Sequence, residues 1–536
     1  MNTNSSLDTD LVREKRNYRV FCDMGGEKFL CSSASSSFKL FLFVVPLILI
    51  SGFVGSRTNL LFTSSYNYYP WISSSVSISP ALSPSSTDNG SSNFDWNSTL
   101  VSITSPPPSP TSPPPPLSVE EMTGAPPPVE NFSNNLSNVA PSPVISDSSR
   151  KWSEIELIEA GLARVRSSVM EAKNSSYKNV QDPDFIPKGP MYWNANAFLK
   201  SYQEMEKQFK IFVYEEGQIP IFHNGPCGSI YAMEGNFINN MEVSKFRTRN
   251  PEKAQAFFLP FSVASIVHFV YEPNSHNWAP LKRLVKDYGH FIATKHPHWN
   301  RSRGADHFML ACHDWGPELS KSYPGMFENS IRALCNANTS EGFKPIKDVS
   351  IPEINLPGGK IDRLLGGPSP SKRPILVFFA GGVHGPVRPI LLEHWENKDP
   401  DVQVYRYLKK GISYHDMLRK SRFCICASGY EVASPRMVEA LYTGCVPVII
   451  KDNYVAPFSD VLNWNAFSVE IPVKDIPNLK NILMGISQRR YIRLQTRGVQ
   501  VRRHFIVNVP PKRFDVFHMT LHSIWLRRLN VRVQDM

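Results

Sequence analysis

The sequence predicts an α/β protein whose folded part holds two doubly wound, Rossmann-like parallel sheets. From about residue 210, apolar runs of strand length alternate with stretches of helical pattern, which is typical of parallel sheets covered by helices. The alternation lapses over residues 340–372, which are rich in Gly and Pro, and then resumes. We therefore expect two lobes, residues 191–365 and 366–536, with a ligand cleft between the carboxyl ends of their sheets.

Each lobe has its own set of expected elements. In the first lobe the strand runs are KIFVYEE, AQAFFLPFS and HFMLACHD, with helices near residues 195–208 and 279–288. In the second lobe they are ILVFFAGG, VQVYRY, RFCICAS and VPVII, and a C-terminal helix closes the chain. Ahead of both, residues 151–190 form a helical neck. Its stripe of Ile158, Leu162, Val165 and Val169 is expected to pack on the following domain or on a partner chain.

The most apolar window, residues 38–55, is expected to cross a membrane once as a signal anchor. It is at the short end of the length that spans a bilayer. Lys and Arg dominate its N-terminal flank, so residues 1–37 are expected in the cytosol and the rest of the chain in the lumen. A cleaved signal peptide is the alternative, but the preceding arm is long for one.

Residues 56–150 are expected to form a disordered luminal stem. They are rich in Ser, Pro and Asn and contain SPPPSPTSPPPP, a composition that cannot bury enough apolar surface to fold. Glycosylation triplets beyond the apolar window agree with a luminal location. We expect glycans at Asn89, Asn97, Asn131, Asn135, Asn174 and Asn338, whereas Asn300 is expected at the rim of the cleft and unused.

Charge and cysteine content limit the function further. The net charge of +11 includes no long polybasic run, which argues against a nucleic-acid partner. The basic residues between Arg489 and Arg528 suggest an acidic ligand, with a solvated basic face as the alternative. Six cysteines follow the apolar window and can be fully paired with one another, and no metal-ligand spacing occurs, so no metal site is expected.

The segment GYEVASPRMVEALYTGCVPVI predicts an anion site at a helix N-terminus. A strand ends at Gly429, and Ser434 can cap a helix whose first position is Pro435. Arg436 then lies in the first turn, where its charge opposes the helix dipole by about 0.3–1 kcal/mol. A bound phosphate would reverse that sign. A surface arginine without a ligand is the alternative.

A second loop has the same pattern. The strand ILVFFA is followed by Gly381, Gly382 and Gly385 and then by a helix that carries Arg388. Glycines let the backbone approach a ligand closely, so Arg388 can reach a diphosphate there. Two such turns in one lobe are a stronger signal than either alone.

Several motifs in order resemble the exostosin-like glycosyltransferases, glycosyltransferase family 47, of plants. They run from KIFVYEEGQIPIFHNGP through HFMLACHDWGP and FFAGGVHGPVR to SGYEVASPRMVEALYTGCVPVI, over roughly residues 190–510. The resemblance implies a GT-B fold, a sugar-nucleotide donor, inversion at the anomeric carbon and a type II topology in the Golgi membrane.

The same resemblance implies roles for residues of the second lobe. Arg388 and Arg436 become candidates for the donor diphosphate, with Ser434 assisting them. Glu439 is expected to hold the nucleotide ribose, and Glu431 to touch hydroxyls of the donor sugar.

Inversion needs a base that deprotonates the acceptor hydroxyl as it attacks. The candidates lie at the two ends of HFMLACHD: His313 and Asp314 are its last two residues, His307 is its first, and Asp306 directly precedes it. We prefer Asp314 and His307; local caps and hydrogen bonds are the alternative for each. His223 and Asp306 are expected on the acceptor side, and Trp299 and Trp315 could stack on sugar rings, although core packing is the default for tryptophan.

The sequence thus leads to a Golgi enzyme that moves a sugar from a UDP-sugar to a wall polysaccharide or another glycan. Neither a cofactor nor a metal is expected. Partners are the donor, the acceptor, the Golgi membrane and, in a homo- or hetero-complex, other transferases. The alternative is a catalytically inactive glycan-binding or assembly subunit of a transferase complex. A hydrolase with paired carboxylates would not need the two arginines.

Overall fold

The computed structural model describes residues 152–174, 181–361 and 363–534. The apolar window, the stem and the triplets at Asn89, Asn97, Asn131 and Asn135 lie outside these residues. Among the described helices, none combines the length and the apolar composition that a bilayer span requires.

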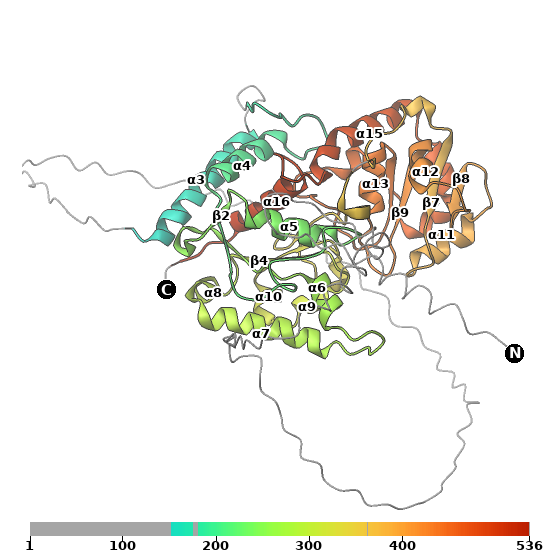
Figure 1. The fold of residues 1–536 in the computed structure, drawn as a ribbon. Coiled ribbons are helices and arrows are strands. Elements are labelled where there is room, and N and C mark those ends of the chain that lie inside the picture. The colour runs from blue at the N-terminus through green and yellow to red at the C-terminus, as the bar shows by residue number, and fades with distance from the viewer. Residues whose placement is uncertain (1–151, 175–180, 362, 535–536) are drawn as a thin grey trace, which may run out of the picture. The chain divides into compact units, whose positions relative to one another are not determined.

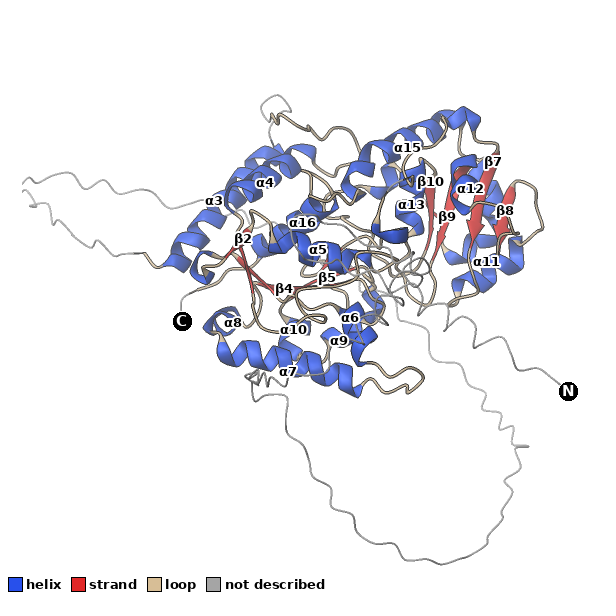
Figure 2. Cartoon of the chain, in the orientation of Figure 1, coloured by secondary structure: helices blue, strands red, loops and turns tan. Residues whose placement is uncertain are grey.

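The first sheet has six parallel strands in the order β2-β1-β3-β4-β5-β6. Figure 2 labels β2, β4 and β5 of this sheet. The strands are β1 (Ile211–Val213), β2 (Arg247–Thr248), β3 (Ala256–Phe258), β4 (His307–Ala311), β5 (Ile331–Leu334) and β6 (Val349–Ser350). The central strands β3, β4 and β5 are buried throughout because helices cover both faces. The helices within this part are α5 (Ala232–Glu242), α6 (Val263–Val270), α7 (Ala279–Lys295), α8 (Pro297–Ser302), α9 (Gly316–Ser320) and α10 (Pro324–Glu328).

The second sheet has five parallel strands in the order β11-β10-β9-β7-β8. They are β7 (Ile375–Ala380), β8 (Val402–Tyr405), β9 (Ser421–Ala427), β10 (Val446–Ile450) and β11 (Val469–Glu470). The covering helices are α11 (Val387–Trp395), α12 (Tyr414–Lys420), α13 (Arg436–Thr443), α14 (Leu479–Met484) and α15 (Gln488–Val501). The expectation of two parallel α/β sheets is therefore confirmed.

The helices at the two ends of the described chain pack together on the first sheet (Figure 1). They are α3 (Glu154–Asn174), α4 (Ala195–Gln208) and α16 (Val516–Asn530). Leu162 and Val165 of α3 are fully buried, as expected for a helix that packs on the following domain. Although α16 follows the second sheet in sequence, it contacts α3, α4, β5 and β6, and Arg528 donates to Glu159 of α3 at 2.6 Å.

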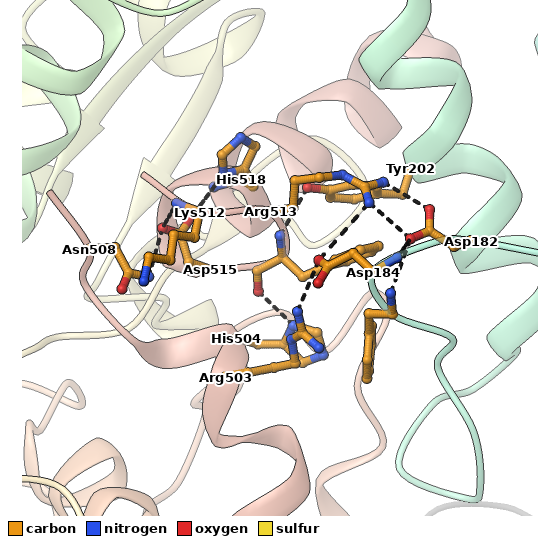
Figure 3. A network of polar contacts seen from close by, with 12 residues as sticks. Asp182, Asp184, Tyr202, Arg503, His504, Asn508, Lys512, Arg513, Asp515 and His518 are labelled. Carbon is orange, nitrogen blue, oxygen red and sulfur yellow. Dashed lines mark hydrogen bonds and ion pairs between the residues drawn. The ribbon is translucent and has the colours of Figure 1, made fainter. Parts of the chain in front are cut away.

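A network of ion pairs ties the segment before α4 to the segment before α16 (Figure 3). Arg513 donates to both carboxylate oxygens of Asp182, at 2.9 and 2.8 Å, and also to Glu206. Arg503 pairs with Asp184 at 3.3 Å and lies over the ring of Phe185. The neck is therefore an integral part of the folded unit.

The cysteines pair differently from the expectation. Two disulfides join described residues, Cys312 with Cys335 and Cys424 with Cys445. Cys426 is free and buried, so the expectation that the six cysteines pair fully with one another is wrong.

Candidate functional site

The carboxyl ends of the two sheets adjoin through the loops that follow β5, β6 and β10. The amide of Thr339 donates to the carbonyl of Asn453 at 2.9 Å, and the amide of Val455 donates to Ala337 at 3.0 Å. Residues that follow the strands of both sheets are thereby brought to one region, the edge at which α/β sheets bind ligands.

Two arginines meet the glycine-rich loops of the second sheet. Arg436, the first residue of α13, donates to the carbonyl of Ala380 at 2.9 Å, and Arg388 of α11 donates to Gly382 at 3.4 Å. A Cβ on Gly381 would lie 2.6 Å from the Arg436 guanidinium, and one on Gly429 would lie 2.9 Å from that of Arg388. The absence of side chains at these glycines lets both guanidinium groups lie against the loops.

The two guanidinium groups keep unused donors. Within the part of the chain that the structure describes, neither arginine forms an ion pair with a carboxylate, and the buried Nε of each lacks a hydrogen-bond partner. Burial, followed by the nearby charge of Arg436, lowers the pKa of Arg388 to about 10. Two adjacent cations with free N–H groups form a site suited to phosphate.

Helix α13 begins one residue later than expected. Pro435, with φ −66° and ψ −16°, occupies the cap position, so no side chain caps the helix. The Oγ of Ser434 is buried and has no partner, so the expected capping bond is absent. This hydroxyl remains able to bind a ligand next to Arg436.

The two glutamates of the same segment have different surroundings. Glu439 is buried on α13 and accepts a hydrogen bond from the Tyr414 hydroxyl at 2.8 Å. Glu431 lies in the loop before the helix, and one of its carboxylate oxygens is buried without a partner. Burial, followed by the charges of Glu341 and Asp314, raises the pKa of Glu431 to about 8.

Asp314 lies at the carboxyl end of β4, across from these loops. The backbone before it is fixed by the buried Glu234, which accepts the amides of Cys312 and His313 at 2.8 and 2.9 Å. Its side chain is half-buried and accepts from Asn336 at 3.4 Å. The structure therefore brings Asp314 together with Glu431, as the electrostatic effect on Glu431 also shows.

The hydrogen bonding of His313 argues against the expectation that this residue is the base. Its Nδ1 accepts the amide of Trp315 at 3.1 Å, so the neutral ring carries its proton on Nε2. Burial lowers the pKa of His313 to about 3, and the ring packs on Tyr231. A neutral ring with one nitrogen bonded and the other protonated has no lone pair left for an acceptor proton.

The structure does not bring His307 or Asp306 to this region. Both lie at the opposite end of β4 and are fully buried. His307 bonds to the Tyr214 hydroxyl and to Asp306, each at 2.7 Å, and Trp299 packs on its ring. Both ring nitrogens of His307 are thus occupied in the core, and we withdraw His307 as a base and Asp306 as an acceptor-side residue.

His223 is held within the first lobe, where its amide donates to the carbonyl of Pro260, just past β3. Its Nδ1 is 3.2 Å from Glu242 at the end of α5, and that glutamate pairs with Arg247. Trp315 stacks on Trp278 with ring centres 4.2 Å apart, so part of its surface is covered by protein.

Comparison with known proteins identifies the family. The model of the exostosin GT47 domain matches residues 205–486, which contain Asp314, Arg388 and Arg436. A probable glycosyltransferase of Arabidopsis thaliana is 54% identical over 528 residues, which cover 94% of this chain and 97% of the relative. The chain belongs to the exostosin family of glycosyltransferases, family 47.

More distant matches extend the comparison of this family 47 chain. A probable glucuronoxylan glucuronosyltransferase of Arabidopsis thaliana is 26% identical over 354 residues, covering 60% of this chain and 74% of the relative. A crystal structure of TarM matches with 12% identity and a TM-score of 0.23, covering 37% of this chain and 51% of the TarM chain.

Two residues of the family 47 domain belong to the site although their sequence context did not single them out. Lys451 directly follows β10; its Nζ donates to Val432 at 2.5 Å, and burial lowers its pKa to about 8. Glu353 follows β6, and burial, followed by the charge of Asp314, raises its pKa to about 8. Both lie just past the carboxyl end of a buried parallel strand, and that position is the signal by which they could have been found.

The described glycosylation triplets of the family 47 chain differ in exposure. Asn174 is exposed at the end of α3. Asn338 is buried, and its amide donates to Glu341 and accepts from Ser340, which argues against a glycan there. Asn300 is exposed on α8, at the end of β4 opposite Asp314, and therefore does not lie at the rim of the site.

Among the residues described, no group of three or more His, Cys, Asp and Glu side chains is arranged to hold a metal ion.

Proposed function

We propose that this glycosyltransferase uses a UDP-sugar and transfers the sugar to a hydroxyl of a cell-wall polysaccharide or another glycan. The observation that carries the proposal is the pair Arg388 and Arg436, which lie against two glycine loops with their Nε groups unpaired. Such a pair suits a diphosphate, the charged part that sugar nucleotides share. The name of the relative from Arabidopsis thaliana, a probable glucuronoxylan glucuronosyltransferase, supports a polysaccharide acceptor.

The remaining donor contacts follow from the same loops. Ser434 offers its unpartnered hydroxyl beside the diphosphate. Glu439, three residues after Arg436 on α13, lies on the same helix face and can accept hydrogen bonds from the ribose. Glu431, whose pKa is raised to about 8, can bind a sugar hydroxyl through the oxygen that has no protein partner.

Asp314 is the proposed base. The acceptor oxygen attacks the anomeric carbon from the face opposite UDP, its proton passes to the Asp314 carboxylate, and the bond from that carbon to the phosphate oxygen breaks. The electron pair of that bond leaves with UDP, whose charge the two arginines stabilise. The anomeric configuration is inverted as a result.

The proposed location is the Golgi membrane, with a type II topology and a luminal catalytic part. It rests on the apolar window and its basic flank in the sequence. A protease-protection assay on intact vesicles tests it: only the N-terminal arm should be digested, and loss of the folded part would overturn the topology.

The activity is tested by offering the full-length chain a panel of UDP-sugars, with and without wall polysaccharides, and measuring UDP release. We expect release from at least one UDP-sugar and its loss in the Arg436→Ala variant. UDP release that is equal in wild type and Arg436→Ala would overturn the donor site.

A further inference from the structure

Asn336 directly follows Cys335, the residue through which a disulfide joins the end of β5 to the end of β4. Cys335 forms the disulfide with Cys312, and the Cα atoms of the two cysteines are 4.6 Å apart. Asn336 and Asp314 therefore each follow a cross-linked strand end, by one and two residues respectively. This covalent link fixes the backbone from which both side chains extend.

The side chain of Asn336 bonds to both lobes at once. Its Oδ1 accepts the amide of Ala433 at 3.0 Å, and its Nδ2 donates to Oδ1 of Asp314 at 3.4 Å. The orientation of the carboxamide is settled by chemistry, because a backbone N–H can only donate and so must face the oxygen. The NH₂ group then has to face Asp314. Asn336 is 2% exposed, so water competes little for either bond.

Ala433 belongs to the loop that carries the proposed donor contacts. It lies between Glu431 and Ser434, and the preceding carbonyl, that of Val432, accepts from Lys451. The loop is thus held by the Lys451 ammonium of its own sheet and by the Asn336 carboxamide of the other sheet. On the opposite side, Glu234 fixes the backbone of residues 312 and 313, which leaves the rotation of the Asp314 side chain to be set by its neighbours.

We infer that Asn336 is a positioning residue. It makes the orientation of Asp314 depend on whether the loop at residues 431–434 occupies the position in which Ala433 bonds to Asn336. When the loop is seated, the Ala433 amide holds the carboxamide oxygen, and the NH₂ group is directed at Asp314. When the loop moves away, the carboxamide loses this restraint and rotates. The acceptor base is therefore aligned when the nucleotide-binding loop is in place. The inference rests on the proposed function, because it takes Asp314 as the base.

Two substitutions separate the two bonds. Asn336→Asp has the same shape and keeps an oxygen for the Ala433 amide, but it presents a second oxygen to Asp314 in place of the donor. Asn336→Ala removes both bonds. Asn236→Ala is the matched control, because Asn236 is a buried asparagine of the same lobe whose amide makes two hydrogen bonds within its own segment, to Cys227 and Ala232.

The first measurement is hydrogen exchange in the full-length chain, followed on peptides that contain Ala433. We expect faster exchange in Asn336→Ala and wild-type exchange in Asn336→Asp and Asn236→Ala. Unchanged exchange in Asn336→Ala would overturn the link to the loop.

The second measurement compares turnover with UDP affinity, using the UDP-sugar that the wild-type chain turns over fastest. For Asn336→Asp we expect kcat to fall about tenfold to a hundredfold, as for a misplaced catalytic group, with UDP affinity within about threefold of wild type. Wild-type kcat in Asn336→Asp would overturn the inference.

Asp314→Asn, measured alongside, distinguishes a failure of the coupling through Asn336 from a failure of Asp314 as the base. If Asp314→Asn is inactive while Asn336→Asp keeps wild-type kcat, the coupling fails and the proposed base stands. If Asp314→Asn keeps wild-type kcat, the proposed base fails, and the role of Asn336 fails with it.

Discussion

The guanidinium of Arg436 donates a hydrogen bond to the carbonyl oxygen of Ala380, 2.9 Å away, and so joins the two glycine-rich loops of the second sheet. Its carbon lies 5.3 Å from the centre of the Phe379 ring, which supports the flat group from one side. The bond uses one nitrogen and leaves Nε without a partner. The arginine is thus held in place by protein while it keeps a donor for a ligand.

Changing Arg436 to Ala should weaken UDP binding at least tenfold, because a charge-assisted hydrogen bond contributes about 1.5–3 kcal/mol. The measurement is isothermal titration calorimetry with UDP. Arg493→Ala, which removes an exposed arginine of α15, is the control and should leave the affinity unchanged. Undiminished affinity in Arg436→Ala would contradict the donor-site assignment.

Changing Asp314 to Asn should lower turnover by about 10²–10⁴-fold, the usual contribution of a general base. UDP affinity should stay close to that of wild type, because Asp314 belongs to the opposite sheet. Steady-state kinetics and calorimetry on one preparation test this. A fully active variant would remove Asp314 as the base.

His307→Gln should act on stability and leave catalysis intact. His307 bonds to Tyr214 and Asp306 in the core, so its replacement should lower the free energy of unfolding by about 1–3 kcal/mol. Urea denaturation measures the loss, and kcat per folded molecule should remain at the wild-type level. A selective fall in kcat without loss of stability would restore His307 as a catalytic candidate.

Glu353 should make the stability of the ligand-free protein fall as the pH rises. Its pKa is raised from 4.5 to about 8, so between these values the folded protein holds a proton that the unfolded chain has released. That contribution to stability is complete below about pH 4.5 and is lost as the pH approaches 8. Glu353→Gln should therefore melt about 2–4 °C above wild type at pH 8 and close to wild type at pH 4.5.

Thermal melts across this pH range test the prediction. Glu431, whose pKa is raised to about 8 as well, should preserve part of the slope in the variant. A melting difference that is the same at both pH values would show that the effect of the substitution is one of packing alone.

Peptide mapping of the protein purified from plant cells should find a glycan at Asn174 and none at Asn338. Asn174 is exposed at a helix end, whereas the amide of Asn338 is buried and bonded to Glu341. Asn338→Gln, which destroys the triplet, should accordingly leave the mass of the glycans unchanged. Glycan-bearing peptides around residue 338 would refute this.

The sequence alone determined the two parallel sheets and the loops that carry Arg388 and Arg436. Parallel strands place their carboxyl ends at one edge, so a glycine-rich turn followed by a helix with an early arginine can be recognised from local order. The same rule, applied to the residues after β6 and β10, would have found Glu353 and Lys451. Local pattern was also sufficient for the buried stripe of α3.

Only the tertiary structure decided which end of HFMLACHD lies at the candidate site and what each side chain bonds to. Asp306 and Asp314 are equally polar in sequence, but the strand between them sends one into the core and the other toward the opposite lobe. Contacts such as that of Asn336 with Ala433 join residues 97 positions apart, and they depend on how the sheets are packed. Periodicity and capping patterns describe residues that are neighbours along the chain. Hydrogen-bond partners in different lobes are set by tertiary packing, so local patterns in a single sequence do not predict them.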